Sequence, residues 1–286
     1  MLKINEILDR YRILYPQNEY ISDLYRSYFE KDFFSIYKII NRGSTDDLKH
    51  RAKNLKKFVL EDNIWSLWDF LFESTDTQFT HALKSLYVKN IEYSVDCFSR
   101  GQLQSKLWLI DELKKTNQTL GTVFLCAGWY ATLAVMIFEN NFRVEKIRSF
   151  DIDSFCPAIA ETFNKPWVID NWKFKSSIAN IHDIDFDMFT YSVSRSNGTQ
   201  CELTDAPNTI INTSCEHIVN FDNWYSRIPK GKLVVLQSNN YKAISDHVNC
   251  VNNLSEFEKQ TPMTDLLFEG ELDLSTYTRF MRIGIR

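Results

Sequence analysis

The chain has 286 residues, and its 33 Lys and Arg against 37 Asp and Glu give a formal net charge of −4. Its 44% hydrophobic and 24% charged residues are typical of a globular protein and exclude a disordered chain. Nucleic-acid affinity comes mainly from neutralised phosphates, so the acidic balance disfavours a general nucleic-acid binder. No apolar run approaches the roughly 18 residues of a membrane span. The N-terminus lacks the apolar core of a signal peptide, so we expect a cytoplasmic protein without a membrane segment.

Six cysteines are spread along the chain, and neighbouring ones are at least 14 positions apart. This spacing contains no CxxC pair and none of the patterns of zinc sites. In a reducing compartment such thiols stay free. The sequence therefore predicts free cysteines and no metal site.

Residues 1–117 have the apolar spacing of helices. Apolar residues recur three and four positions apart, for example at Ile4, Ile7, Leu8 and Tyr11. The last of these helices is expected over residues 103–113, after a break at Arg100 and Gly101. The pattern predicts an all-helical N-terminal domain over 1–117.

The run of residues 49–57 is the one basic cluster of the sequence. It has two interpretations. It is either the solvated face of an amphipathic helix or a patch for a phosphate-bearing substrate or RNA.

From residue 118 the pattern changes to short β runs that alternate with helical segments. This alternation predicts a doubly wound, mostly parallel α/β sheet over 118–286. An Asn-Gly pair at Asn197 and Gly198 predicts a β-hairpin or an ordered loop between the third and fourth strands, in place of a crossover helix. The last two strands are predicted to form an antiparallel edge. The expected strands are 122–127, 146–152, 172–181, 208–213, 232–237, 268–274 and 277–285, and the expected helices are 130–139, 154–163 and 245–260.

Chemically useful residues follow four of the predicted strands, at the edge where open α/β sheets bind ligands. Gly128 follows the first strand and allows a tight turn, so that the next helix start can face a ligand. Asp151 ends the second strand, where an acid can accept both hydroxyls of a ribose. Residues 180–183 follow the third strand and offer polar and apolar side chains for an adenine. Residues 212–217, after the fourth strand, are all polar or reactive.

The order of these four segments resembles the class I S-adenosylmethionine-dependent methyltransferase superfamily. The resemblance covers about residues 118–286 and implies a Rossmann-like methyltransferase fold that binds S-adenosyl-L-methionine. It implies that a side chain on Gly128 would intrude on the methionine end of the cofactor. The cofactor-binding residues implied by the resemblance are Ala127, Gly128, Tyr130, Asp151, Ile152, Asn180, Ile181, Asn212 and Thr213.

The loop after the fourth strand is expected to carry the transfer chemistry. Its candidate catalytic residues are Asn212, Glu216 and His217. The pKa of histidine suits His217 to remove a proton near neutrality, with Glu216 to orient it. Asn212 would hold an acceptor amine or hydroxyl. Cys215 could act as a nucleophile only with a lowered pKa.

The sequence therefore predicts an S-adenosylmethionine-dependent methyltransferase that acts on a small or medium organic substrate. Three alternatives stay open. The helical N-terminal domain also resembles that of nicotianamine synthase-like enzymes, which transfer the aminocarboxypropyl group of the same cofactor. The glycine-poor loop is also compatible with a non-catalytic protein that binds a nucleotide or a partner. RNA methylation through residues 49–57 is the third. The sequence does not indicate the oligomeric state.

Overall fold

The computed structural model describes residues 82, 85–86, 89, 91–98, 100–194 and 197–286. The chain divides into two compact units, residues 1–104 and residues 105–286. Helix α7 (Arg100–Lys115) crosses this division. Most of the predicted helical domain over 1–117, including residues 49–57, lies outside the described residues, and that domain stays a prediction. The helix expected over 103–113 corresponds to α7, which begins at Arg100 rather than after a break there.

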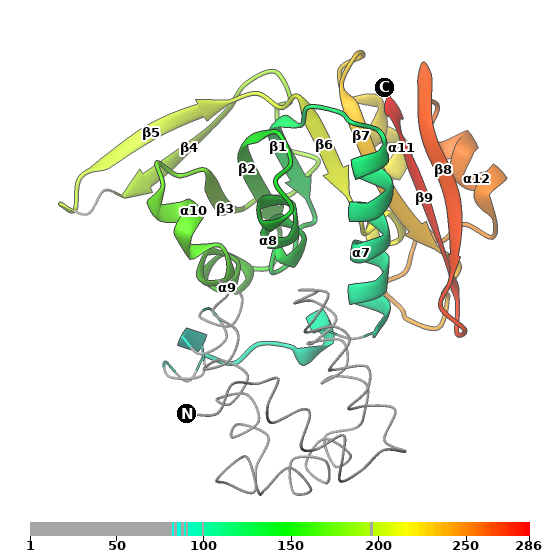
Figure 1. Ribbon diagram of the computed structural model, residues 1–286, viewed down its shortest axis with the longest axis horizontal. Coiled ribbons are helices and arrows are strands. Elements are labelled where there is room, and N and C mark those ends of the chain that lie inside the picture. Colours follow the sequence, from blue (N-terminus) through cyan, green and yellow to red (C-terminus); the bar gives the residue numbers. More distant parts are fainter. Residues whose placement is uncertain (1–81, 83–84, 87–88, 90, 99, 195–196) are drawn as a thin grey trace, which may run out of the picture. The chain divides into compact units, whose positions relative to one another are not determined.

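The second unit is built on a seven-stranded sheet with the order β3-β2-β1-β6-β7-β9-β8 (Figure 1). Its first five strands in this order, β3, β2, β1, β6 and β7, run parallel to one another, whereas β9 runs antiparallel to both β7 and β8. This arrangement confirms the predicted doubly wound, mostly parallel sheet with an antiparallel edge. The strands of this sheet are β1 (Gly121–Cys126), β2 (Val144–Asp151), β3 (Phe174–Ile178), β6 (Thr209–Asn212), β7 (Leu233–Asn239), β8 (Asp265–Asp273) and β9 (Thr278–Ile285).

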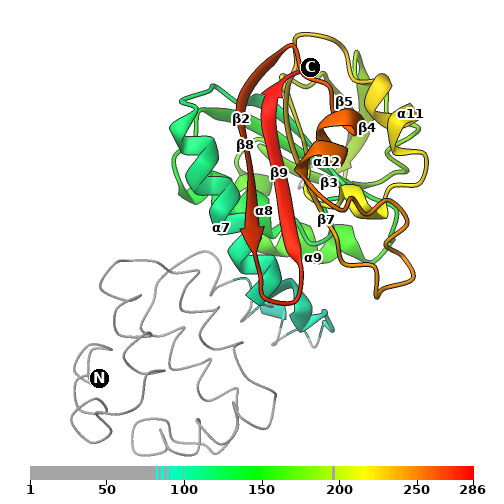
Figure 2. The ribbon, with the colours of Figure 1, turned by 90° about the vertical axis from the view of Figure 1, so that its right-hand side faces the viewer.

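Helices lie on both faces of the sheet, as Figure 2 shows with α7 on one side and α11 and α12 on the other. Their apolar faces cover strands that are buried along their full length, such as β1 and β7. Among the described residues, no helix has the length and apolar character to span a membrane. The remaining helices are η1 (Val95–Phe98), α8 (Thr132–Glu139), α9 (Cys156–Phe163), α10 (Lys165–Ile169), η2 (Cys215–His217), α11 (Phe221–Ser226) and α12 (Leu254–Gln260).

The core on the α11 side is aromatic. Phe124 and Phe150 project from β1 and β2 and meet edge to face, with ring centroids 5.1 Å apart. Trp224 of α11 and Phe257 of α12 are fully buried in the same cluster. Burial of such rings fixes the sheet rigidly, so the loops at its carboxyl edge start from well-defined positions.

The predicted hairpin is confirmed as β4 (Phe189–Ser194) and β5 (Gln200–Asp205), which form a separate two-stranded sheet. Asp205 holds it against the main sheet. The carboxylate of Asp205 lies 2.6 Å from Nε of Arg148 on β2 and accepts a 2.6 Å hydrogen bond from the hydroxyl of Tyr191. Both Asp205 and Arg148 are buried. The hairpin thus takes the place of a crossover helix.

Several predicted elements differ from the observed ones in their bounds. The helix expected over 245–260 is limited to α12, because Asn253 caps it by accepting a hydrogen bond from the backbone N–H of Glu256. The strand expected over 232–237 continues to Asn239, so the polar residues Ser238 and Asn239 belong to buried β7. The helix expected from residue 130 begins at Thr132, because the preceding loop is left-handed at Ala131.

Candidate functional site at the carboxyl edge of the sheet

The loop between β1 and α8 has an alternating backbone. Ala127, Trp129 and Ala131 have φ angles of 51°, 49° and 50°, in the left-handed region that glycine adopts most readily. The alternate spacing is that of a glycine-rich loop, with alanine and tryptophan in its left-handed places. The loop therefore contains one glycine but adopts the positive φ angles that glycine usually supplies, which the sequence did not indicate.

Gly128 has a different role from the one expected. Its φ is not positive, and a Cβ there would collide with Oγ of Ser149 on β2 and approach Cγ of Leu125 to 3.1 Å. The side chain would thus meet the sheet rather than a cofactor. Gly128 lets the loop lie close to β2, and its N–H donates to the carbonyl of Phe150 at 2.9 Å.

Ala131→Gly is expected to raise the free energy of unfolding by about 0.5–1 kcal/mol, because relief of a left-handed alanine exceeds the entropy cost of glycine. Urea denaturation measures the change. Ala134→Gly, inside α8, is the matched control and should instead cost about 1 kcal/mol. Destabilisation by Ala131→Gly would show that residue 131 is not held left-handed.

Asp151 ends β2 and joins the loop to the sheet edge. The backbone N–H of Trp129 donates to its Oδ2 at 2.7 Å, and the N–H of Asp153 donates to its Oδ1 at 3.1 Å. A carboxylate oxygen accepts two hydrogen bonds, so each oxygen retains capacity for a ligand hydroxyl. The side chain of Asp151 is half-buried, so part of it stays accessible beside the loop.

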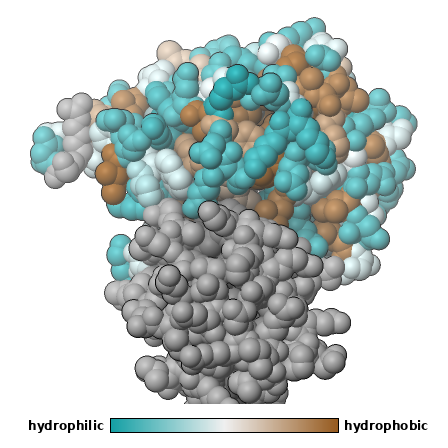
Figure 3. Space-filling model, viewed as in Figure 1, coloured by the Kyte–Doolittle hydropathy of each residue, from teal (hydrophilic) through white to brown (hydrophobic). Residues whose placement is uncertain are grey.

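Apolar side chains lie exposed at this edge. Ile152 is 74% exposed, Ile178 at the end of β3 is 59% exposed, and Phe155 is 77% exposed. Such residues are usually buried, and their position beside Asp151 suits the face of an aromatic ligand ring. On the face that Figure 3 shows, apolar residues form separate patches divided by hydrophilic ones.

The two residues predicted to contact an adenine, Asn180 and Ile181, differ in their exposure to solvent. Asn180 is exposed, and its Oδ1 accepts the backbone N–H of His182 at 3.0 Å. Ile181 is buried in the core cluster, where it packs under the edge instead of facing a ligand. Ile152 and Ile178 are better placed than Ile181 for the apolar contact.

Two predicted cofactor residues after β6 are buried. Asn212 is fully buried, with its Oδ1 accepting the N–H of Ser214 at 2.8 Å and its Nδ2 without a hydrogen-bond partner. The carbonyl of Thr213 accepts a hydrogen bond from Nη2 of Arg279. Tyr130 is also buried and stacks on Trp129, with centroids 4.6 Å apart. These residues shape the walls beneath the edge.

Glu216 has a structural partner that the sequence did not indicate. Its Oε1 lies 2.6 Å from Nη1 of Arg279 and accepts a 2.6 Å hydrogen bond from Nδ2 of Asn239. Glu216 and Arg279 are both buried. This placement argues against Glu216 as a free partner of a general base. The last strand carries two arginines, Arg279 and Arg282, among mostly apolar residues, and this was the available signal for a buried charge.

His217 is the exposed member of the predicted catalytic trio. Its Nδ1 lies 3.1 Å from the carbonyl of Asp246, and its ring meets that of His247 edge-on at 4.5 Å. Desolvation, together with the facing His247, lowers the pKa of His217. Cys215 is fully buried, and burial and the charge of Glu216 raise the pKa of its thiol, both of which argue against an activated nucleophile.

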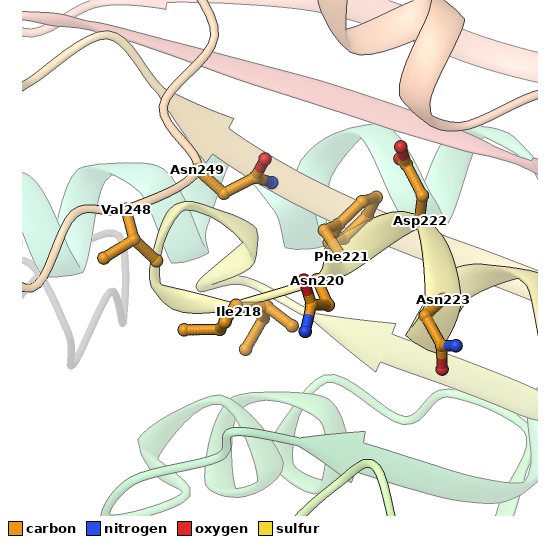
Figure 4. Close-up of a pocket in the computed structure, with 8 residues that line it drawn as sticks. Ile218, Asn220, Phe221, Asp222, Asn223, Val248 and Asn249 are labelled. Carbon is orange, nitrogen blue, oxygen red and sulfur yellow. The ribbon is translucent and has the colours of Figure 1, made fainter.

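A pocket of about 520 Å³ lies beside this loop. Figure 4 shows it between residues 218–223 and the segment that carries Val248 and Asn249. The backbone N–H of Asn249 donates to the carbonyl of Glu216 at 2.8 Å, which holds the two segments together. The pocket gives space for a small organic molecule next to the carboxyl end of β6.

The reversal of β9 between β7 and β8 gives the antiparallel edge that the sequence predicts. The fold is a doubly wound, mostly parallel sheet of the Rossmann-like type with one reversed strand. No protein-family model and no curated protein matches this sequence.

Solved methyltransferase structures are similar to the chain at low identity. A candidate sarcosine dimethylglycine methyltransferase from Galdieria sulphuraria has a TM-score of 0.46 at 10% identity, over 72% of this chain and 97% of that one. Geranyl diphosphate C-methyltransferase from Streptomyces coelicolor A3(2) has a TM-score of 0.44 at 12% identity, over 65% and 76%. N-methyltransferase NodS from Bradyrhizobium japonicum WM9 has a TM-score of 0.44 at 8% identity, over 64% and 94%.

Proposed function

We propose that the chain is an S-adenosylmethionine-dependent methyltransferase that acts on a small or medium organic substrate in the cytoplasm. One observation carries this proposal. Asp151 ends β2 of the seven-stranded sheet. Its carboxylate accepts the backbone N–H of Trp129, which lies in the loop after β1 whose alternate residues have positive φ angles. An acid in that place can bind a ribose at the edge where doubly wound sheets take their ligands.

The residues of this edge fit the cofactor. Asp151 would accept the ribose hydroxyls, the exposed Ile152 and Ile178 would contact the adenine face, and Asn180 its polar edge. The loop over Ala127 and Gly128 would lie along the methionine part. The bound cofactor supplies an electrophilic methyl group on its sulfonium. The chain then has to align an acceptor and exclude water, and the pocket beside residues 218–223 is the available space.

Titration with S-adenosylmethionine tests the proposal. We expect saturable binding by calorimetry and a change in tryptophan fluorescence, because Trp129 donates its N–H to the proposed ribose acid. Trp129→Phe should remove most of the fluorescence change and keep the heat. Adenosine alone should bind more weakly, since it lacks the methionine part. The absence of both heat and a fluorescence change up to about millimolar cofactor, the range of a −4 kcal/mol interaction, would exclude the proposed function.

The released nucleoside identifies the transferred group. Methyl transfer leaves S-adenosylhomocysteine, whereas aminocarboxypropyl transfer leaves methylthioadenosine. Mass spectrometry of the cofactor products separates the two once an acceptor has been found. Binding without either product from any acceptor would favour the non-catalytic alternative.

A further inference from the structure

Two histidines and a glutamate meet at the edge of the sheet. Each of Glu216, His217 and His247 offers one ligand atom, and these atoms all lie within 4.8 Å of one another. Glu216 and His217 follow β6, whereas His247 lies 30 positions further on, after β7. The sequence predicted no metal site. Its local spacing does not indicate this cluster, because only the fold brings the two segments together.

We infer that Glu216, His217 and His247 form a binding site for a divalent transition-metal cation of the Zn²⁺ type. Two imidazoles and one carboxylate are ligands that such cations prefer, and Mg²⁺ prefers oxygen ligands alone. Three protein ligands leave a four-coordinate cation one position for water or an acceptor group. This inference goes beyond the proposed function and does not depend on cofactor binding.

The carboxylate is oriented for this role by its neighbours. Glu216 is 2% exposed, and its Oε1 is held by Arg279 and Asn239. Its Oε2 is buried and has no hydrogen-bond partner. An unpartnered buried carboxylate oxygen costs stability unless something binds it. A cation would satisfy this oxygen, with Arg279 and Asn239 as the outer partners that fix the ligand.

Both imidazoles are also oriented from their far side. Nδ1 of His217 lies 3.1 Å from the carbonyl of Asp246, and Nδ1 of His247 contacts the carbonyl of Tyr241. A carbonyl only accepts, so each Nδ1 carries the proton and each Nε2 keeps its lone pair. This is the arrangement that metal-bound histidines use. Cys250 is on the Nδ1 side of His247, at 3.8 Å, and is therefore not a ligand.

The cluster needs only a small adjustment to bind. Ligand atoms about 2.1 Å from a tetrahedral Zn²⁺ are roughly 3.4 Å apart. Rotation of the exposed His217 side chain would close the present separation of up to 4.8 Å. The site would adjoin the pocket, because His217 and His247 directly precede the lining residues Ile218 and Val248.

The test uses the full chain without a polyhistidine tag. Competition against a chromogenic chelator should show one Zn²⁺ per chain that excess Mg²⁺ does not displace. His217→Ala and His247→Ala should each weaken binding by at least about tenfold, the lower range for losses at a metal site. His182→Ala is the matched control. His182 contacts the carbonyl of Val219 at 2.9 Å, lies outside the cluster and should leave Zn²⁺ affinity unchanged.

Co²⁺ absorption and urea denaturation of a double variant test the metal site further. Co²⁺ should give a visible absorption spectrum that is lost in the His217→Ala/His247→Ala double variant, with folding of that variant checked by urea denaturation. If a folded double variant binds Zn²⁺ as tightly as the unmodified chain, the cation is elsewhere and the inference is wrong. Absence of one-to-one Zn²⁺ binding by the unmodified chain also overturns it, as does an equal loss in His182→Ala.

Discussion

Arg279→Met is expected to lower the free energy of unfolding by about 3–5 kcal/mol, because it leaves the buried carboxylate of Glu216 without the guanidinium that neutralises it. Glu216 and Arg279 have side chains that are 3% and 6% exposed, so solvent cannot replace the lost partner. Arg279 also donates to the carbonyl of Thr213, and the variant loses that link between β9 and the loop after β6. Urea denaturation followed by circular dichroism measures the loss.

Arg282→Met is the matched control on the same strand. Arg282 is as buried as Arg279, but the carboxylate of its partner Glu269 is 36% exposed and stays solvated when the arginine is removed. The control should therefore cost distinctly less. The double variant Glu216→Leu/Arg279→Met should recover much of the loss, because it removes both charges together. Equal losses for Arg279→Met and Arg282→Met would contradict the assigned role of the buried pair.

Asp151→Ala is expected to weaken S-adenosylmethionine binding by about 10- to 150-fold, which corresponds to the loss of roughly 1.5–3 kcal/mol for hydrogen bonds to a charged group. The variant also loses the acceptor for the N–H of Trp129, so part of the effect will come from the loop. Calorimetry on the purified variant gives the affinity.

Asp151→Asn and Asp153→Ala separate these contributions. Asparagine keeps one oxygen acceptor and removes the charge, so its affinity should fall between those of the unmodified chain and Asp151→Ala. Asp153 accepts the N–H of Phe155 at 2.9 Å and is exposed, so Asp153→Ala should lower stability modestly and leave affinity almost unchanged. An unchanged affinity in folded Asp151→Ala would place the ribose elsewhere.

The centre of the sheet was predictable because β1, β6 and β7 begin as short apolar runs that turn residues or a helix follow. The unbroken apolar runs in β1 and at the start of β7 predict that these strands are buried. The residues after the parallel strands were expected to share one edge of the sheet, since parallel strands end at one edge. Strand ends were less accurate, as the polar end of β7 shows, because buried Ser238 and Asn239 look like loop residues.

The roles within the site were harder to predict. Glu216 and His217 are adjacent in sequence, yet one is buried against Arg279 and the other is exposed beside His247. Those partners are 63 and 30 positions away, and no local pattern connects them. The left-handed loop was missed for a related reason. Its conformation is imposed by contacts with β2, whereas glycine content is the signal that a sequence offers.

The β4–β5 hairpin, which replaces a crossover helix, exposes strand edges with which another protein molecule could pair. A helix satisfies its backbone internally, whereas β4 and β5, in the described part of the chain, pair only with each other and leave two open strand edges. Their outward side chains are polar: Thr190, Ser192, Ser194, Gln200, Glu202 and Thr204. A strand of another molecule that added to either edge would find no apolar surface on that side to bury. The alternation that packs Tyr191 and Val193 inward thus also protects the protein against edge-to-edge self-association.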